Sequence, residues 1–591
     1  MSHTDLRSFL DALEKAGELV RITEPVSADQ EITAIQHRVL PRGGPALLFE
    51  NVAGSPYRLV SNLFGTLKRV EMAMGGDPAA LGEKVASLAH RLMPPSIANV
   101  WRARADLSRI TKARIRRVTG GPILDREISP PAIDELPVLT CWPLDGGPFF
   151  TLPLVHTVDP TTGIGNLGIY RMQRYGNDAT GMHWQIEKGG GFHFRKACEM
   201  GRPLTVSVFL GGPPALTIAA IAPLPEGIDE RMLAALMMGR PLDMIPREAT
   251  GHLIPATAEI VLEGSVTDGD TRREGPFGDH LGHYSHSADF PVFRIHRMLA
   301  RRDAIYPATV VGKPPQEDFY IGVGLVEMTA PLLRLMRPAI IDLWSYPESG
   351  FHPLAAASVR ERYPKEALKH AFGILGEGQL SLTKILILTG PECDDVRDFR
   401  KVSGAVWRHL DIEEGLHLLA PTAQDTLDFT GPAMNTGSRL ILIATDRPGG
   451  PLRTAPPPAP PKPDDVHGDI DAMIALGEAF LIVRIGEDAD KPQVMAALNR
   501  HPLTKQYLFH ILVSTDVDIH DPMMVLWGWF TRFDPLTDLH PNGKRLEGNR
   551  VVFSFPIAID ATWKPGYRKP VEIAPDIEKR VNEKWSRYGI D

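Results

Sequence analysis

Residues 258–280 read AEIVLEGSVTDGDTRREGPFGDH, and this stretch decides how the middle of the chain is interpreted. Its first part, AEIVLEGSV (258–266), is short, β-branched and alternating, which is typical of a strand. Two further runs, PLTVSVFLG (203–211) and FPVFRIHRML (290–299), have the same character, and glycine-rich turns separate them. This spacing favours a β-barrel or sandwich between about residues 119 and 330 over an array of βαβ units.

The segments on either side of this β-rich region are typical of α/β structure. Apolar residues recur at helical spacing from Leu6 to Leu13, and Gly17 then marks the end of the predicted helix. The run PALLFENV (45–52) predicts a buried strand, and residues 66–115 return to a helical pattern. We therefore expect an α+β multidomain chain with an N-terminal α/β domain (1–118), a central β-rich domain (119–330) and a C-terminal α/β domain (331–591).

The C-terminal domain contains a weak internal repeat. LTKILILTGPECDDVRDFRKVSGAVWRHL (382–410) is echoed by LTKQYLFHILVSTDVDIHDPMMVLWGWF (503–530), and each predicts a strand, an acidic turn and a helix. Chance similarity of two βα units is the alternative to a duplication. Between them, residues 448–463 hold eight prolines in sixteen positions, which predicts a stiff, extended linker.

Composition and charge exclude several classes of protein. With 591 residues, the chain is long enough for two to four domains, and 43% hydrophobic and 23% charged residues are typical of a globular protein. The net charge of −8 gives no reason to expect nucleic-acid binding. The three cysteines form no CxxC pair, no run of 18 apolar residues exists, and the N-terminus lacks the apolar core of a signal peptide. We therefore expect a cytoplasmic protein without a transmembrane segment.

The motifs of several common enzyme classes are missing, which directs attention to three other segments. No Walker loop, GxGxxG fingerprint, GxSxG elbow or HExxH motif is present. KGGGFH (188–193) is a basic glycine run that could bind a phosphate through backbone N–H groups. EGPFGDH (274–280) carries two carboxylates, and NLGIYRMQ (166–173) carries an arginine in an apolar run. Carboxylates near a buried cation can divide into a protonated and an ionised acid, whereas the alternative is a solvated loop.

Taken together, these segments make the chain resemble the UbiD family of decarboxylases, which use prenylated FMN. The resemblance runs over about residues 1–445, through DLRSFLDALEKAGELVRIT, GGPALLFENV, SNLFGTLKRVEMAMG, LPVLTCWPLDGGPF, GNLGIYRMQ, AEIVLEG and EGPFGDH. It implies that the central β-rich domain is a split β-barrel like that of flavin reductases. It also implies that the C-terminal domain drives oligomerisation and moves as a lid.

The resemblance assigns catalytic roles to three residues of this chain. Arg171 matches the family's catalytic arginine, which orients the substrate carboxylate, and Glu274 is the acid beside it. Asp279 matches the second acid and is the expected proton donor to the carbon that CO₂ leaves. The cofactor supplies the electron sink that loss of CO₂ from an sp² carbon requires.

Cofactor and metal contacts are implied in the same way. Asn166 and Glu230 match ligands of a divalent metal, usually Mn²⁺, that bridges the cofactor phosphate to the protein with K⁺ nearby. Some members have a histidine as a third ligand, but that position falls here on Trp184, so His183 is expected only as a contact. The expected cofactor-binding residues are Ile169, Tyr170, Arg171, His183, Trp184, Gln185, Lys188 and Gly189.

The expected activity is non-oxidative decarboxylation of an aromatic acid, with 4-hydroxy-3-polyprenylbenzoate of ubiquinone synthesis as the leading substrate. A menaquinone-pathway acid or another aryl or heteroaryl acid is the alternative within the family, in either reaction direction. A flavin oxidoreductase on a split barrel and an inactive flavin-binding scaffold are the alternatives outside it. The expected partners are a UbiX-like flavin prenyltransferase that supplies the cofactor, further copies of the chain, and a membrane surface if the substrate is polyprenylated.

Overall fold

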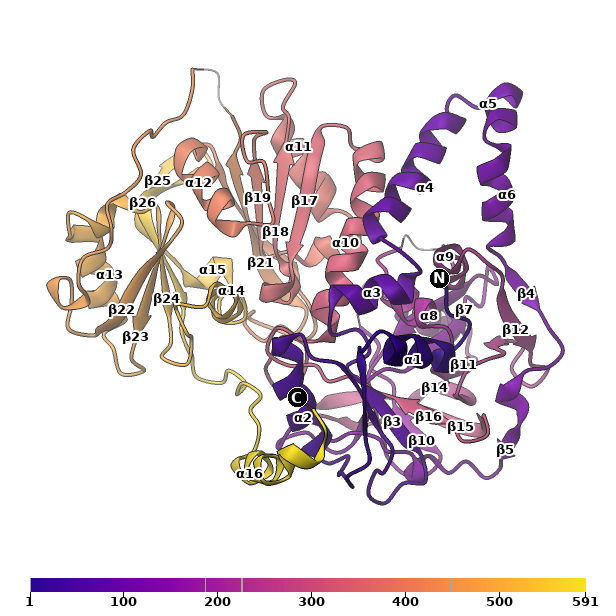
Figure 1. Cartoon of the computed structure of the whole chain (residues 1–591). Coiled ribbons are helices and arrows are strands. Elements are labelled where there is room, and N and C mark those ends of the chain that lie inside the picture. The colour runs from indigo at the N-terminus through magenta and orange to yellow at the C-terminus, as the bar shows by residue number, and fades with distance from the viewer. Residues whose placement is uncertain (1, 186–187, 225–226, 447–448, 591) are drawn as a thin grey trace. The chain divides into compact units, whose positions relative to one another are not determined.

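The computed structural model describes residues 2–185, 188–224, 227–446 and 449–590, and these form two compact units. The first unit contains residues 1–331 together with the C-terminal segment 569–591, and the second contains residues 332–568. The C-terminal segment therefore belongs to the same unit as the N-terminus. Its helix α16 (Pro575–Lys584), yellow in Figure 1, lies beside the indigo helix α2 (Glu31–Val39), where Lys584 Nζ contacts Glu31 Oε1 at 2.9 Å.

The N-terminal part of the first unit is a small mixed sheet with helices, as the sequence predicts. Its strand order is β1-β2-β3-β16, with β1 parallel to β2 and β16 parallel to β3. Helix α1 begins at a capping box between Asp5 and Ser8, and its apolar residues from Leu6 to Leu13 are buried. The bounds are α1 (Leu6–Lys15), β1 (Leu19–Ile22), β2 (Ala46–Phe49), β3 (Arg58–Ser61), α3 (Leu67–Met74), α4 (Pro78–Leu92), α5 (Ile97–Arg102), α6 (Arg104–Lys112) and β16 (Ile305–Pro307).

The central part of the first unit is built on an antiparallel seven-stranded sheet. The three runs that predicted strands form its centre, because β14 pairs with β11 on one side and with β15 on the other. The order is β10-β15-β14-β11-β7-β8, with β5 also on β15. The bounds are β5 (Arg126–Ile128), β7 (Leu154–Val158), β8 (Gly165–Ile169), β10 (Ala179–Gly181), β11 (Leu204–Leu210), β14 (Ile260–Glu274) and β15 (Ala288–Ala300).

This sheet does not close into a barrel within the described residues, since β10 and β8 remain at its two ends. The finer expectation of a split barrel stays a prediction. Two smaller sheets, β13-β12-β4 and β6-β9, and three helices complete this part. Their bounds are β4 (Ile115–Arg117), β6 (Phe149–Phe150), β9 (Met172–Gln173), α7 (Gly189–Glu199), α8 (Pro214–Ile221), α9 (Glu230–Met238), β12 (Leu242–Pro246) and β13 (Leu253–Pro255).

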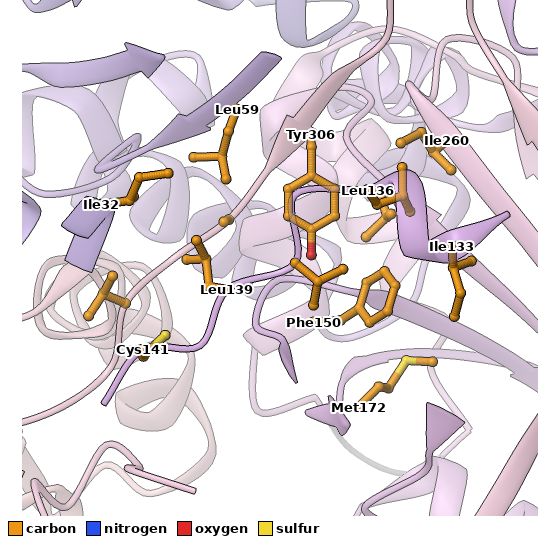
Figure 2. Packing of buried hydrophobic residues seen from close by; sticks show 14 of the residues in the cluster. Ile32, Leu59, Ile133, Leu136, Leu139, Cys141, Phe150, Met172, Ile260 and Tyr306 are labelled. Atoms are coloured by element: carbon orange, nitrogen blue, oxygen red, sulfur yellow. The ribbon is translucent and has the colours of Figure 1, made fainter. Parts of the chain in front are cut away.

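One buried apolar cluster joins the two parts of the first unit. Figure 2 shows Tyr306 of β16 near Phe150 of β6, with ring centroids 6.0 Å apart, among aliphatic side chains from both parts. Burial of this much apolar surface is the main favourable contribution to folding. It also fixes the N-terminal sheet against the strands that carry the candidate site.

Helix α10 (Glu317–Met336) is, among the residues the structure describes, the one helix long and apolar enough to cross a membrane. Only 33% of its most apolar window is buried, and core helices pass the same criterion. Its first turn begins in the first unit, where the buried Glu317 carboxylate accepts hydrogen bonds from the Phe64 backbone N–H and the Thr309 hydroxyl. These bonds satisfy a carboxylate that would otherwise be costly to bury.

The second unit contains two sheets of identical topology, which extends the expected repeat from a βα unit to a whole sheet. Their orders are β17-β18-β19-β21-β20 and β22-β23-β24-β26-β25, with the same parallel and antiparallel pairs at corresponding places. The first has β17 (Ile340–Tyr346), β18 (Phe351–Val359), α11 (Glu366–Leu375), β19 (Ile385–Thr389), α12 (Phe399–His409), β20 (Leu416–Ala423) and β21 (Thr436–Ala444). The second has β22 (Ile470–Leu476), β23 (Phe480–Ile485), α13 (Lys491–Arg500), β24 (Phe509–Val513), α14 (Pro522–Phe530), α15 (Pro535–Asp538), β25 (Leu539–Glu547) and β26 (Arg550–Ala561).

The proline-rich linker lies between these two sheets in sequence, and it is bonded to both. The backbone carbonyl of Ala455 accepts a hydrogen bond from Trp407 of α12, and that of Pro458 accepts one from the Tyr507 hydroxyl. Pro448, the first residue of the expected linker, lies outside the described residues. Residues 449–462 form no helix or strand, and Pro463 begins a short 3-10 helix (Pro463–Asp465); the stiffness of the linker stays a prediction.

Candidate active site

Glu274, Arg171 and His183 form a buried, hydrogen-bonded cluster at one end of the central sheet. Glu274 is the last residue of β14, Arg171 connects β8 to β9, and His183 follows β10. Arg171 Nε donates to Glu274 Oε1 at 3.0 Å, and His183 Nδ1 lies 3.0 Å from the same oxygen. The three side chains are 0%, 9% and 2% exposed, in the order Glu274, Arg171, His183. The structure therefore brings together Arg171 and Glu274, which the sequence selected from separate motifs.

The electrostatics of this cluster keep Glu274 ionised. Burial alone would raise the pKa of Glu274, but the hydrogen bond from His183 and the charge of Arg171 outweigh it and hold the pKa below its ordinary value. Aromatic rings lie against the Arg171 and His183 side chains: the Phe277 ring lies 5.1 Å from the Arg171 guanidinium carbon, and the Phe290 ring 4.2 Å from the His183 ring. The sequence did not place His183 beside Glu274, because this contact depends on the pairing of β10 with β15.

Several polar atoms around this cluster are buried without a hydrogen-bond partner among the described residues. They are Arg171 Nη1, Arg171 Nη2, Glu274 Oε2, Asn166 Nδ2 and Trp184 Nε1. Buried polar groups in folded proteins are nearly always hydrogen-bonded, so a group of exceptions in one region points to a polar ligand. Arg171 thus offers two N–H groups of one guanidinium plane, the arrangement that binds a carboxylate in a bidentate manner.

The KGGGFH segment forms the N-terminus of a helix rather than a free loop. Lys188 is the N-cap residue and Gly189 the first residue of α7, whose N-terminal N–H groups and dipole favour an anion. The Gly190 N–H donates to the Tyr170 hydroxyl at 3.0 Å, and the Tyr170 and Trp184 rings lie 5.0 Å apart. Four of the expected cofactor-binding residues therefore lie around the start of α7: Tyr170, Trp184, Lys188 and Gly189.

Glycine is required at this helix start because neighbouring side chains approach the backbone closely. A Cβ on Gly189 would lie 2.1 Å from Asn166 Oδ1, and one on Gly190 would lie 2.6 Å from the Trp184 ring. Of the other expected contacts, Ile169 ends β8 opposite Leu154, and Gln185 precedes residues 186–187, which lie outside the described part of the chain. Strand β8, the segment that follows β10, and the start of α7 therefore lie together. We call the surface that they form the α7 cradle.

Glu230 contacts strand β8 at the residue that follows Asn166. Glu230 is the first residue of α9, and its Oε2 accepts the backbone N–H of Leu167, next to Asn166, at 2.7 Å. Burial raises the pKa of Glu230 to about 7, although the Leu167 hydrogen bond opposes this. An amide oxygen and a carboxylate are the ligand types that hard divalent cations prefer, so this donor pair fits the expected metal.

Asp279 lies in the loop that follows β14, and the C-terminal segment of the chain holds this loop. Asp279 Oδ1 accepts the Leu281 N–H at 2.9 Å, so the carboxylate shapes its own turn. The Tyr284 N–H donates to the Lys569 carbonyl at 3.1 Å, and the Val571 N–H donates to the Gly282 carbonyl at 2.9 Å. Residues 569–571 thus form an added backbone connection to the Asp279 loop, which no local sequence signal predicted.

Two further polar residues form hydrogen bonds to the same loop, and neither was predicted as a site residue from the sequence. Gln173 accepts the Gly275 N–H at 2.8 Å and donates to the Gly146 carbonyl at 2.6 Å. Asp145 accepts the Gly278 N–H at 2.8 Å, and burial raises the pKa of Asp145 to about 7. The RMQ triplet in the arginine motif was the signal available for Gln173, whereas Asp145 had none.

Comparison with known proteins adds to this geometry. Three domain profiles of one family match the chain in order, covering more than half of it: the 3-octaprenyl-4-hydroxybenzoate carboxy-lyase N-terminal domain (residues 10–89), Rift-related domain (116–314) and C-terminal domain (319–444). The chain belongs to the UbiD family. As a UbiD-family carboxy-lyase it is an enzyme, and the family profiles end where the first sheet of the second unit ends.

Relatives of this UbiD-family enzyme include proteins that share its full length. A Chlamydia pneumoniae protein, named as one of the subunits of a 4-hydroxybenzoate decarboxylase, is 41% identical over 589 residues, covering 99% of this chain and 98% of that protein. An Archaeoglobus fulgidus protein is 39% identical over 449 residues, covering 76% of this chain and 92% of that protein. Some relatives thus match nearly the whole chain, and others match about three quarters of it.

Solved structures show the same mixed α/β multidomain fold. Vanillic acid decarboxylase of Sedimentibacter hydroxybenzoicus, in its closed form, matches with a TM-score of 0.67 at 23% identity, covering 79% of this chain and 97% of that chain. The UbiD-class enzyme HmfF of Pelotomaculum thermopropionicum, in complex with FMN, matches with a TM-score of 0.62 at 24% identity, covering 78% and 99%. An evolved dimeric form of HmfF is in complex with prenylated FMN.

Proposed function

We propose that this enzyme decarboxylates an aromatic carboxylic acid without oxidation, with prenylated FMN as its cofactor. The observation that carries the proposal is the buried Arg171–Glu274–His183 cluster, whose Arg171 Nη1 and Nη2 and Glu274 Oε2 have no partner among the described residues. Its position beside the α7 cradle suits an acid held against a flavin. When bound, the prenylated flavin would supply the electron sink for the electron pair that the departing CO₂ leaves on the substrate.

The chain's own residues would bind the substrate and control its protonation. Arg171 Nη1 and Nη2 hold the substrate carboxylate in a bidentate manner, and the ionised Glu274 fixes the guanidinium plane through Nε. Asp279 delivers the proton that replaces CO₂ on the ring carbon, so one aryl carboxylate and one proton give CO₂ and the neutral arene, with hydrogen where the carboxylate was. The apolar rings of Phe277 and Phe290 exclude water from the site.

The cofactor would be held through its phosphate and its ring system. Asn166 and Glu230 would bind Mn²⁺ against the phosphate, with K⁺ nearby, and the α7 N-terminus with Lys188 would stabilise the remaining negative charge. Ile169, Tyr170, Trp184, Gln185 and Gly189 complete the expected binding surface, and His183 faces Glu274. Glu230 with its raised pKa is a carboxylate whose charge a bound cation would favour.

For the substrate we propose an acid of the 4-hydroxybenzoate class. The name of the Chlamydia pneumoniae relative supports a 4-hydroxybenzoate, and the family description supports its octaprenyl derivative. The 4-hydroxy-3-polyprenylbenzoate of ubiquinone synthesis is our first candidate, and a menaquinone-pathway or other aryl acid is the alternative. A cytoplasmic homo-oligomer supplied by a UbiX-like flavin prenyltransferase, with access to the membrane surface for a polyprenylated acid, completes the proposal.

Reconstitution tests this proposal. The chain is co-expressed with a flavin prenyltransferase, purified anaerobically, and its bound flavin is identified by absorbance spectroscopy and mass spectrometry. It is then incubated with 4-hydroxybenzoate, its 3-prenylated derivatives, vanillate and furan-dicarboxylate, and headspace CO₂ is measured. We expect bound prenylated FMN and CO₂ from at least one hydroxybenzoate. A purified protein that binds no prenylated flavin would refute the proposal.

A further inference from the structure

The second unit contains a cluster of three potential metal ligands that the decarboxylase chemistry does not use. Glu392, His409 and Asp446 each offer one ligand atom, and these atoms all lie within 4.8 Å of one another. His409 is buried, and the two carboxylates lie at the protein surface. The cluster combines one imidazole nitrogen with two carboxylate oxygens.

The topology of the first sheet explains why these residues converge. Strands β19 and β21 are parallel neighbours, and their last paired residues are Thr389 and Ala444. Glu392 follows the first of these strand ends by three residues and Asp446 follows the second by two, so both emerge at the carboxyl edge of the sheet. His409 is the last residue of α12, the helix that follows β19. Carboxyl edges of parallel strands are common positions for ligand sites.

The surroundings of the cluster favour a cation. His409 is only 4% exposed; its Nε2 faces Glu392 Oε1 at ion-pair distance, and its Nδ1 has no hydrogen-bond partner among the described residues. Arg408 Nε lies 3.6 Å from Glu392 and offsets part of the negative charge. A buried imidazole that lies beside two carboxylates offers a nitrogen ligand to a metal ion.

The second sheet provides an internal comparison, because it has the same topology and a different set of side chains. There the last paired residues of the parallel strands are Val513 and Ala561. Asp516 follows the first by three residues, and Trp563 follows the second by two, at the places that correspond to Glu392 and Asp446. Arg532 corresponds to His409, since each follows its helix N-cap, Asp521 or Asp398, by eleven residues.

In this second sheet, a positively charged side chain occupies the place between the strand ends. Arg532 Nη1 and Nη2 donate to the two carboxylate oxygens of Asp516 at 2.7 and 2.6 Å, and its guanidinium lies 4.1 Å from the Trp563 ring. The first sheet has a second carboxylate in place of the tryptophan and a histidine in place of the arginine. It therefore has no arginine at the place of Arg532, and its three side chains are of the types that bind a metal ion.

We propose that Glu392, His409 and Asp446 bind one divalent transition-metal ion of the Zn²⁺ type, with water completing the coordination. Zinc accepts imidazole nitrogen and carboxylate oxygen at about 2.0–2.2 Å, so ligand atoms on one ion lie at most about 4.4 Å apart. The ligand atoms of the three side chains now lie within 4.8 Å of one another, so a small shift of the side chains would bring them within this distance. The bound ion ties the ends of β19, α12 and β21 together, as the Asp516–Arg532 pair does in the second sheet.

Zinc titration of the full-length chain tests this proposal. The chain carries Glu230→Gln to remove the other expected metal site, is stripped with a chelator, and is titrated with ZnCl₂ by isothermal calorimetry. We expect one Zn²⁺ per chain, an affinity at least tenfold weaker for Asp446→Asn and Glu392→Gln, and a rise in Tm with Zn²⁺ that these variants lose. Asp394→Asn is the matched control, because it removes an exposed carboxylate from the same loop, and it should bind Zn²⁺ normally.

Two results would overturn the proposal. One is equal zinc stoichiometry and affinity in Asp446→Asn and Asp394→Asn. The other comes from crystals of the unsubstituted chain soaked in Zn²⁺ and needs no variant to fold: an anomalous difference map without a peak between Glu392, His409 and Asp446. A peak there, with the loss of affinity in both cluster variants, would establish the site.

Discussion

Arg171 donates its Nε–H to Glu274 Oε1 at 3.0 Å and keeps both Nη groups free of hydrogen bonds to the described residues. The carboxylate thus fixes the guanidinium on one side, and the other side is available to a ligand. With Nε bonded to Glu274, the edge formed by Nη1 and Nη2 presents two parallel donors to an incoming acid.

Replacing Arg171 by lysine tests the need for two donors. Lysine keeps the positive charge but loses the planar fork, so we expect kcat/KM for decarboxylation to fall by about 100-fold or more. Arg174→Lys is a matched control, because the Arg174 side chain bonds only weakly, to the Asp134 carbonyl at 3.3 Å. Similar losses in the two variants would show that Arg171 has no special role.

His183 should influence the pH below which the enzyme loses activity. Its hydrogen bond and charge help to hold the pKa of Glu274 below its ordinary value, so removing them should raise that pKa. In His183→Leu the acid limb of the kcat/KM profile should therefore move to higher pH. His183→Asn keeps a donor near the Nδ1 position and should shift the limb less. An unchanged acid limb in the leucine variant would contradict this role.

The same interaction predicts the direction of a stability change. A carboxylate whose pKa is lowered by folding stabilises the native state above its unfolded pKa, and this contribution is lost as the pH falls through the folded pKa. His183→Leu should therefore have a lower free energy of unfolding than the parent at pH 7. Its free energy of unfolding should also fall less than that of the parent between pH 7 and pH 4. Denaturant titrations at pH 7 and pH 4 measure both differences.

Val571 should hold the loop of Asp279 in place. Its N–H bonds to the Gly282 carbonyl, and its side chain packs so closely that a Cβ on Gly278 would lie 2.6 Å from it. Val571→Ala should cost on the order of 1–3 kcal/mol of local packing and lower kcat while the flavin stays bound. Glu572→Gln alters the next, exposed side chain and should leave both unchanged. Normal kcat in Val571→Ala would argue against a positioning role.

The glycines at the start of α7 should differ in their tolerance of a methyl group. Gly189→Ala would place Cβ 2.1 Å from Asn166 Oδ1, so we expect the bound flavin per chain to fall severalfold or more. At Gly191 the nearest atom to a Cβ is the Gln185 carbonyl at 3.2 Å, and Gly191→Ala should retain flavin. Equal flavin content in the two variants, measured by absorbance after anaerobic purification, would contradict the cradle.

Local sequence patterns predicted the elements well and their assembly poorly. Alternation identified the central strands, including β14, and helical spacing that ends before Gly17 identified α1. Arg171 and Glu274 were selected through a family resemblance, since 103 residues separate them and no local pattern encodes their contact. The contacts of His183 and Val571 arise only when strands and the C-terminal segment are placed in three dimensions.

The duplication of the sheet was also only partly predictable from local sequence patterns. Sequence similarity was visible only around one strand and helix, where buried apolar residues repeat in the same order. The remaining strands differ in sequence but keep the same pairing, because register and order depend on the burial of apolar faces rather than on particular residues. The ligand cluster was hidden for the same reason: Glu392, His409 and Asp446 are separate in sequence and meet at a sheet edge.

Measurement of CO₂ release per prenylated FMN in the parent enzyme and in Glu274→Gln tests the proposed chemistry most directly. Both proteins are purified anaerobically from cells with a flavin prenyltransferase, and an active hydroxybenzoate is supplied in excess. Multiple turnovers in the parent, and loss of turnover in Glu274→Gln with an unchanged flavin content, are the expected results. Continued turnover in Glu274→Gln at a rate near that of the parent would contradict the role of the Arg171–Glu274 pair.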